Sequence, residues 1–218
     1  DPISAFGGVI ACNYKINKKI ATEINKNFLE VILAKGFDQE SLEILKRKKN
    51  LRIIDISNFK LKNLTAIKLF DNSFLVQSKD NVILERKKLK CVTKLKPNKK
   101  ELAEIQFAFN VCKHVKSNAI VLCSNFSTIG IGAGQPSRLD SCRIAVQKAK
   151  QFQSSKIKNS IAASDAFFPF ADGIKTLIKA GVKTIIQPGG SIRDQEIINV
   201  ANKAKIKMFF TSIRHFNH

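Results

Sequence analysis

The sequence predicts an α/β fold, in which helices cover a largely parallel sheet in layers. Short apolar runs with strand character alternate with amphipathic segments of helical period along most of the chain. Several helical segments also carry a capping residue at their start or a glycine at their end. Alternation at this spacing is typical of α/β layers, and 218 residues suffice for one large domain or for two lobes of about 100 residues each.

The first half of the chain carries two helical and three strand-like segments. The first helix is predicted from Ile20, Ile24 and Phe28, which recur at i, i+4 spacing on one face. The second is predicted to begin at Asp38, whose side chain can cap a helix. The predicted ranges are a helix at 17–29, a strand at 30–34, a helix at 38–48, and strands at 51–57 and 68–78.

The second half repeats the alternation more regularly. Pro97 opens a helix whose apolar face includes Ile105 and Phe109. Two later helices are predicted to start at Asp172 and at Ser191, each as the capping residue, and the first of them ends at Gly181. Strands are predicted at 118–124, from 126 onward, at 182–187 and at 207–212.

The composition narrows the class of partner. The formal net charge is +21, but 31 of the 38 basic residues are lysines spread through nearly every segment. Nucleic-acid-binding surfaces concentrate arginine and interleave aromatic rings, whereas this chain has no Trp and a single Tyr. We therefore expect no nucleic-acid partner. We also expect no membrane partner, because no apolar run approaches the roughly 18 residues needed to cross a bilayer and no basic leader precedes an apolar run.

The five cysteines and three histidines do not form a metal-binding pattern. The chain has no C-x-x-C pair, and His114, His215 and His218 lack the spacing of metal ligands. We therefore expect no zinc, reduced cysteines packed as small apolar side chains, and a cytoplasmic location.

The glycine-rich stretch TIGIGAGQPSR tests for a dinucleotide site. Such a site needs G-x-G-x-x-G and an acidic residue about 20 positions later. Here Gly130, Gly132 and Gly134 form G-x-G-x-G, and no acid follows in the segment QKAKQFQSSKIKN. What remains is a backbone that passes close to a ligand before Ser137 and Arg138, which favours an anionic or amide-rich ligand. The alternative is that the glycines only turn the chain.

Two further segments are candidates for ligand contact. In SDAFFPFADG (164–173), two acids flank three phenylalanines just after a predicted strand, so the rings could sandwich a flat heterocycle. In QPGGSIRD (187–194), Gly189 and Gly190 place backbone N–H groups before a helix, which suits a carboxylate or phosphate. Ordinary core packing and an ordinary strand-to-helix turn are the respective alternatives.

Six segments together resemble one family: DPISAFGG, VKSNAIV, TIGIGAGQPSR, SDAFFPFADG, QPGGSIRD and RHFNH. They are similar, in this order, to the transformylase part of the bifunctional AICAR transformylase/IMP cyclohydrolase family. That family transfers a formyl group from 10-formyltetrahydrofolate to phosphoribosylaminoimidazolecarboxamide (AICAR) in purine biosynthesis. The resemblance implies layered α/β/α lobes that resemble the cytidine deaminase fold without zinc, and a homodimer with active sites at the subunit interface. It implies the end of the first lobe at residues 1–96 and the second lobe at 97–218.

The resemblance also assigns roles to individual residues. Positions that bind the nucleotide correspond to Asp1, Asn118, Arg138, Phe167 and Arg214. Positions on the folate side correspond to Leu139, Asp172, Ser191 and Ile192. Asp165 and Ser117 match positions where some members hold potassium. Arg214 is then expected to hold the phosphate, Asn118 to orient the carboxamide, and Phe167 to pack on the imidazole, while the glycines let the backbone run close to the ligand.

Two departures from the family pattern bear on function. Ala171 stands where the family motif F-F-P-F-R-D has arginine. The family's Lys-His pair, which handles the proton of the amine and assists the folate leaving group, lies upstream of the segment that opens this chain. We therefore expect this chain, which also lacks the cyclohydrolase domain, to show negligible turnover alone. The alternative is a non-catalytic module that binds nucleotide or folate.

Overall fold

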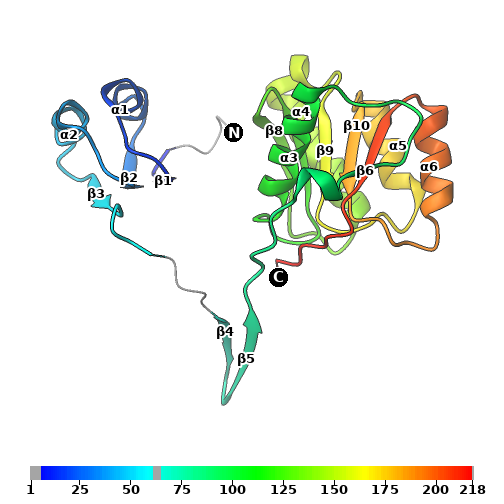
Figure 1. Ribbon diagram of the computed structural model, residues 1–218, viewed down its shortest axis with the longest axis horizontal. Helices are drawn as coiled ribbons and strands as arrows, with labels where there is room; N and C mark the ends of the chain where they lie inside the picture. Colours follow the sequence, from blue (N-terminus) through cyan, green and yellow to red (C-terminus); the bar gives the residue numbers. More distant parts are fainter. Residues whose placement is uncertain (1–5, 61–64, 218) are drawn as a thin grey trace. The chain divides into compact units, whose positions relative to one another are not determined.

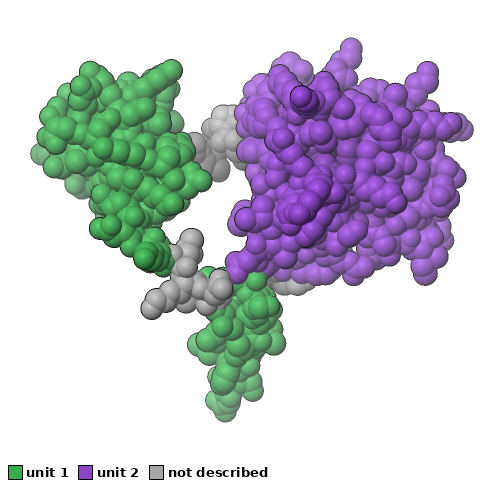
Figure 2. Space-filling model, in the orientation of Figure 1, with its two compact units in different colours: residues 1–79 green, residues 80–218 purple. Residues whose placement is uncertain are grey.

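The computed structural model describes residues 6–60 and 65–217, and it forms two compact units. Unit 1 comprises residues 1–79 and unit 2 comprises residues 80–218 (Figure 2). Among the described residues, none of the helices combines the length and the apolar character needed to cross a membrane.

Unit 1 contains a three-stranded parallel sheet in the order β1-β2-β3 (Figure 1). Two helices connect the strands. The predicted cap at Asp38 is confirmed, since its Oδ1 accepts from Ser41 N at 2.7 Å, and Asn17 caps the first helix in the same way, with Oδ1 accepting from Ile20 N at 3.0 Å. Both helices end three or four residues earlier than predicted, because the chain needs those residues to turn into the next strand. The elements are β1 (Gly8–Cys12), α1 (Lys18–Asn25), β2 (Leu29–Ala34), α2 (Gln39–Leu45) and β3 (Arg52–Asp55).

The two faces of this small sheet differ. On one face, Ile10, Ile32 and Ile53 lie in register and pack with residues of α1 and α2 in a single apolar cluster. On the other face, Val9 is 66% exposed and Ile54 is 43% exposed. Within the described residues of unit 1, the two helices therefore cover one face of the sheet only.

Residues 65–78 form a β-hairpin and not the single strand predicted at 68–78. Strands β4 (Thr65–Phe70) and β5 (Ser73–Ser78) pair antiparallel, with Phe70 opposite Ser73. The chain reverses through Asp71 and Asn72, and Asp71 has a φ of 42°. Two-residue hairpin turns need positive φ, which Asp and Asn tolerate, so this pair of residues was the sequence signal for the reversal.

Unit 2 is built on a six-stranded sheet in the order β6-β11-β10-β9-β7-β8 (Figure 1). The prediction of a largely parallel sheet is wrong here, because only β9-β10 and β10-β11 pair in parallel, while the three other pairings are antiparallel. The direct β7-to-β8 turn at Asn125 and Phe126, both with positive φ, produces one of them. The strands are β6 (Lys90–Cys91), β7 (Ile120–Ser124), β8 (Ser127–Gly132), β9 (Ile161–Ser164), β10 (Thr184–Gln187) and β11 (Lys207–Phe210).

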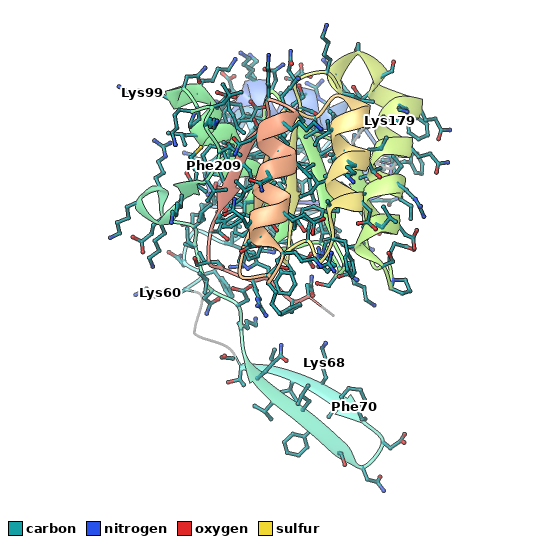
Figure 3. The ribbon with its side chains drawn as sticks, turned by 90° about the vertical axis from the view of Figure 1, so that its right-hand side faces the viewer. Lys60, Lys68, Phe70, Lys99, Lys179 and Phe209 are labelled. Carbon is teal, nitrogen blue, oxygen red and sulfur yellow. The ribbon has the colours of Figure 1, made fainter. Side chains whose placement is uncertain are left out.

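Helices cover both faces of this sheet, so the predicted layered α/β fold is confirmed. Helices α4, α5 and α6 lie side by side over one face (Figure 3), while α3 packs on β7 and β9 from the other. Neighbouring strand residues alternate between two cores, since Met208 faces the first helix group and Phe209 faces the α3 side. The helices are α3 (Lys99–Cys112), α4 (Arg138–Gln153), α5 (Ala171–Ala180) and α6 (Asp194–Lys203), with short 3-10 turns at Arg86–Lys88 and Ser154–Lys156.

The helix starts in unit 2 correct two predictions. Asp172 does not cap α5, because Phe170 occupies the N-cap position and Asp172 Oδ1 accepts from Gly173 N at 2.7 Å inside the first turn. Ser191 does not cap α6, which begins at Asp194. There Asp194 Oδ2 accepts from Gly190 N at 2.7 Å, so the acid closes a turn ahead of the helix. The predicted end of α5 at Gly181, with a φ of 107°, is confirmed.

Residues 80–96 belong to the fold of unit 2. Leu84 is 2% exposed and packs in the α3-side core, and β6 pairs with β11. The division between family lobes after residue 96 stays a prediction.

Candidate functional site

Unit 2 contains a cleft of about 540 Å³ at one edge of its sheet. The carboxyl end of β9 lies at this edge, and so does the amino end of β7, because the two strands are antiparallel. The amino termini of α4 and α5 face the same space, as expected where ligands bind α/β sheets. Six residues singled out from the sequence line the cleft: Asn118, Arg138, Leu139, Phe167, Asp172 and Arg214.

A buried ion pair forms the floor of the cleft. Arg138, the first residue of α4, donates from Nη1 to Asp165 Oδ1, and the two side chains are 8% and 1% exposed. Nη1 also donates to Ser164 Oγ at 2.8 Å, and Asp165 Oδ1 also accepts from Ala119 N at 3.1 Å. A buried pair of charges is tolerated only when further hydrogen bonds satisfy both groups, and this pair has them. The guanidinium of Arg138 is therefore fixed by protein contacts.

The fixed guanidinium in turn holds the carboxamide of Asn118. Arg138 Nη2 donates to Asn118 Oδ1 at 2.8 Å. Asn118 Nδ2 donates to the carbonyls of Gln135 and Pro136, at 2.8 and 3.1 Å. Both N–H groups of the amide are used, and one lone pair of Oδ1 remains available toward the cleft. Asn118 thus presents a hydrogen-bond acceptor of set orientation.

Arg214 and Phe167 supply a cation and a ring. The guanidinium carbon of Arg214 lies 4.9 Å from the centroid of the Phe167 ring. Arg214 is exposed, and among the described residues no carboxylate forms an ion pair with it. The turn at Gly190 lies beside it, since a β-carbon there would approach Nη2 of Arg214 to 3.9 Å. An exposed arginine over an aromatic ring suits a ligand that carries both a flat ring and a phosphate.

The residues predicted for the folate side are only partly brought together. Leu139 and Asp172 line the cleft, whereas Ser191 and Ile192 do not. Ile192 lies in the turn before α6 with its side chain fully exposed. Asp1 lies outside the described residues.

Ala171 and Phe170 lie at the rim of the cleft, on the side predicted for the folate. Ala171, at the position of the family arginine, is 4% exposed at the start of α5. A different arginine, Arg193, places its guanidinium carbon 4.9 Å from the centroid of Phe170, which lines the cleft. The rim therefore carries a second arginine–aromatic pair.

Asp165 and Ser117, the positions predicted for potassium, contact each other and further protein groups. Ser117 Oγ donates to Asp165 Oδ2, and the other oxygen of the carboxylate accepts from Arg138 and Ala119. The potassium site stays a prediction. Over residues 6–60 and 65–217, no group of three or more His, Cys, Asp or Glu side chains could hold a metal.

Gly130 and Gly132 of TIGIGAGQPSR make room for α4, a packing role that the sequence interpretation did not assign to them. A β-carbon on Gly130 would lie 2.2 Å from the carbonyl oxygen of Ala145, and one on Gly132 would lie 1.9 Å from that of Ser141. Both carbonyls belong to α4. The two glycines therefore let β8 pack directly on the backbone of α4, and in this way they position Arg138.

The five cysteines are free, and three of them are unsuited to nucleophilic chemistry. Cys12, Cys112, Cys123 and Cys142 are buried, and Cys91 is half-buried. Burial raises the pKa of Cys123 and Cys142 to about 12, and burial together with the charge of Asp165 raises the pKa of Cys112 well above its usual value. The expectation of reduced thiols packed in the core is confirmed.

Sequence reasoning missed two supports of the cleft. Gln187, fully buried at the end of β10, accepts from Phe168 N through Oε1 at 2.9 Å and so fixes the loop that carries Phe167. Ser164 bridges Arg138 and the carbonyl of Ala166. The detectable signal was a polar residue directly after a buried apolar strand, which occurs in both places.

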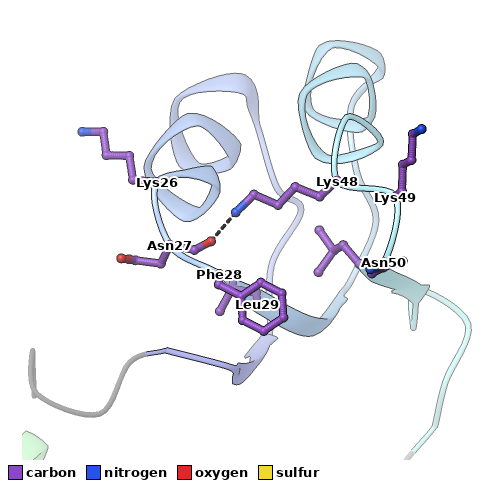
Figure 4. Close-up of a pocket in the computed structure, with 8 residues that line it drawn as sticks. Lys26, Asn27, Phe28, Leu29, Lys48, Lys49 and Asn50 are labelled. Atoms are coloured by element: carbon purple, nitrogen blue, oxygen red, sulfur yellow. Dashed lines mark hydrogen bonds between the residues drawn. The ribbon is translucent and has the colours of Figure 1, made fainter.

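A smaller pocket of about 300 Å³ lies in unit 1 (Figure 4). It is lined by Phe28 and by three lysines, but Lys26 is paired with Glu23 and Lys48 donates to the carbonyl of Asn27. It contains none of the residues that the sequence predicted to contact a ligand. The cleft of unit 2 is therefore the stronger candidate.

Comparison with known proteins identifies the family that this chain resembles. The family described as AICARFT/IMPCHase bienzyme matches residues 1–148. The chain is 46% identical over 218 residues to "Bifunctional purine biosynthesis protein PurH" of Aquifex aeolicus (strain VF5), and 47% identical over 227 residues to the protein of the same name from Bartonella bacilliformis. Each alignment covers 100% of this chain and 42% of the relative, so the chain spans less than half the length of these relatives.

One solved structure, "Reduced HcgD from Methanocaldococcus jannaschii", aligns with 95% of this chain and 72% of its own, at 9% identity and a TM-score of 0.22. A likeness this weak supports no argument about the fold.

Proposed function

The chain belongs to the AICARFT/IMPCHase bienzyme family, and from this premise we propose that its cleft in unit 2 binds the substrates of AICAR formyl transfer in purine biosynthesis. The observation that carries the proposal is the convergence of four separate segments on one cleft. They contribute Asn118, Arg138, Phe167 and Arg214, which are the nucleotide positions implied by the family resemblance and covered by the structure.

The nucleotide half of the cleft accounts for each part of AICAR. Arg214 is the group that holds the phosphate, because its donors face the cleft without a carboxylate partner among the described residues. Phe167 offers its ring to the imidazole. Asn118 Oδ1 accepts from an N–H of the carboxamide or the amine, and Arg138 keeps that oxygen in place. These contacts would hold the amine in one orientation toward the formyl donor.

The folate half is made of Leu139, Phe170 and Asp172. The exposed carboxylate of Asp172 accepts from the N–H groups of a pterin, and Leu139 with Phe170 gives an apolar wall for the rings of 10-formyltetrahydrofolate. Ser191 and Ile192 would join this half if the turn before α6 moved toward the cleft on binding.

The proposed reaction makes and breaks one carbon–nitrogen bond. The amine of AICAR attacks the formyl carbon, the bond from that carbon to N10 of the folate breaks, and N10 takes a proton while the amine loses one. That amine is a weak nucleophile because its lone pair is delocalised into the ring, so a proton-accepting group is needed. No His or Lys is among the described residues that line the cleft. We therefore propose that the chain alone binds both substrates but does not turn them over.

Two further properties of the family are part of this proposal. They are a homodimer with active sites at the subunit interface, where Asp1 would contribute, and a cytoplasmic location. Potassium has no part in the proposed steps.

Two measurements test the proposal. Calorimetric titration of the chain with AICAR should give one saturable site per chain, and Arg214→Ala should weaken it by roughly 100-fold, as expected for the loss of a charge-assisted phosphate contact. Glu85→Ala, which changes an exposed side chain that does not line the cleft, is the control and should leave the affinity unchanged. Formyl-transfer assays distinguish the alternative, a non-catalytic binding module: restoring the family's upstream segment with its Lys-His pair should produce turnover, and a module would stay inactive.

A further inference from the structure

The C-terminal segment that carries Arg214 has no regular secondary structure, so other contacts must fix it. Backbone hydrogen bonds tie its first residues to the β10 region, from Thr211 N to Gln187 O at 3.0 Å and from Ser212 N to Pro188 O at 2.9 Å. Beyond these, His215 N donates to the carbonyl of Asp165 at 2.9 Å. Arg214 lies between these two sets of contacts, directly beside His215.

His215 is the inward-facing residue of this segment. Its side chain is 3% exposed, and its ring centroid lies 4.8 Å from that of Phe109 on α3. Its neighbours Arg214 and Phe216 both line the cleft. Alternate residues of an extended chain point to opposite sides, so anchoring His215 on the core side sets the direction in which Arg214 points.

The polar partner of the buried ring is Asp80, which lies 135 residues earlier in the chain. Asp80 Oδ2 is 2.5 Å from His215 Nδ1. Asp80 Oδ1 accepts from Val82 N at 3.1 Å and lies 3.7 Å from Lys113 Nζ. Burial by itself would raise the pKa of Asp80, but the hydrogen bond and charge of His215, with smaller help from Val82 and Lys113, lower it.

We propose that Asp80 is a positioning residue that fixes Arg214, through His215, for contact with the phosphate of the nucleotide. This inference rests on the proposed function, since it concerns the same cleft. The physical reason is pre-organisation: an arginine on an irregular segment loses conformational entropy when it binds an anion, and anchoring the adjacent residue removes part of that cost beforehand. Asp80 also begins unit 2, so the same contact fastens the start of the unit beside its functional cleft.

The test compares two ligands that differ only by the phosphate. The dissociation constants of AICAR and of its nucleoside are measured by calorimetry on the same protein preparation, and the ratio of the nucleoside's dissociation constant to that of AICAR reports the phosphate contact. We expect Asp80→Ala to reduce this ratio by about tenfold through weaker binding of AICAR, with the nucleoside unaffected. The matched control is Glu85→Ala, which removes an exposed carboxylate of the same segment, paired only with Lys87 and Lys88 in the hydrogen-bonded and ionic contacts described.

Two further variants separate positioning from general stability. In Asp80→Asn, the amide oxygen can still accept from His215, so much of the ratio should be recovered. In an Arg214→Ala background, Asp80→Ala should have no further effect on the ratio, because its action passes through Arg214. A partly unfolded preparation lowers the number of sites for both ligands and leaves the ratio unchanged.

The outcomes are distinguishable. A wild-type ratio near one contradicts the proposed function, and this inference fails with it. A high wild-type ratio that persists in Asp80→Ala overturns the positioning role alone. An equal loss of affinity for both ligands in Asp80→Ala also overturns it, since the residue would then act on the cleft as a whole.

Discussion

Unit 1 and unit 2 both pack helices against a sheet, but they differ in how many faces of the sheet the helices cover. In unit 2, helices cover both faces of the sheet, and two apolar cores separate alternate strand residues. In the described residues of unit 1, two helices cover one face, and Val9 and Ile54 remain exposed on the other. A sheet needs both apolar faces covered for full stability. Unit 2 therefore has two covered cores, whereas unit 1 presents apolar side chains on one face of its sheet.

The ion pairs of the two units show the same contrast. Unit 2 buries an ion pair, Arg138–Asp165, and satisfies both partners with hydrogen bonds, which only a well-packed interior allows. Every ion pair described in unit 1 is exposed on both sides, as Lys18–Glu40 illustrates. The polar network that could hold a ligand is therefore located in the unit with the complete core.

The largest expected effect comes from breaking the buried pair. Asp165→Asn leaves the guanidinium of Arg138 buried without a counter-charge, which should lower the free energy of unfolding of unit 2 by about 3–5 kcal/mol. Residue-resolved hydrogen exchange should show the loss in unit 2 amides and not in unit 1 amides. Asp140→Asn, which removes an exposed partner of Arg143, is the control and should change stability by less than about 0.5 kcal/mol. Equal effects of the two substitutions would mean that the Arg138–Asp165 pair is not buried in solution.

A somewhat smaller effect should follow from filling the contact between β8 and α4. Gly132→Ala places a β-carbon 1.9 Å from the carbonyl oxygen of Ser141, so backbone must move, and unit 2 should lose about 3 kcal/mol. The counterpart in unit 1 is Gly36→Ala, where φ is 102° but the nearest atoms are the flexible side chain of Lys15 at 3.6 Å. It should cost only about 1 kcal/mol, from the unfavourable φ. Hydrogen exchange of the amides of each unit, measured at increasing denaturant concentration, gives both stability losses. A larger loss for Gly36→Ala than for Gly132→Ala would refute the packing role of Gly132.

The smallest effect tests the open face of unit 1. Val9→Thr keeps the shape and adds a hydroxyl at a position that is 66% exposed, so stability should change by less than about 0.5 kcal/mol. Val182→Thr makes the same change at a fully buried position of unit 2 and should cost about 1–3 kcal/mol. If Val9→Thr were as costly as Val182→Thr in a thermal melt, the outer face of the unit 1 sheet would be covered in solution.

The helices could be predicted well from the sequence, because their signals are local. Asn17 and Asp38 cap the helices that follow them, and Gly181 ends α5 as expected. The errors arose where more than one local arrangement satisfies the same pattern. The helix predicted to start at Ser191 begins at Asp194, whose side chain closes the turn at Gly190, and the β-rich run at 68–78 reverses at Asp71. Strand β1, which begins at the second of two consecutive glycines, and the two-residue β6 carry too little pattern to be recognised.

The cleft was partly predictable for a different reason. Several residues that line it belong to segments of unusual composition, so Phe167 and Arg138 could be singled out without a structure. Its supports could not, since a contact such as Asp80–His215 joins residues that are 135 positions apart and individually ordinary. The packing role of Gly130 and Gly132 was not predicted because a sequence cannot show whether glycine makes room for a ligand or for a helix, and here it makes room for α4.

A crystal structure of the chain with AICAR tests the central claim most directly. The account predicts the phosphate within hydrogen-bond distance of the Arg214 guanidinium, the imidazole against the ring of Phe167, and the carboxamide or amine at Asn118 Oδ1. A nucleotide bound outside this cleft, with Arg214 and Asn118 untouched, would contradict it.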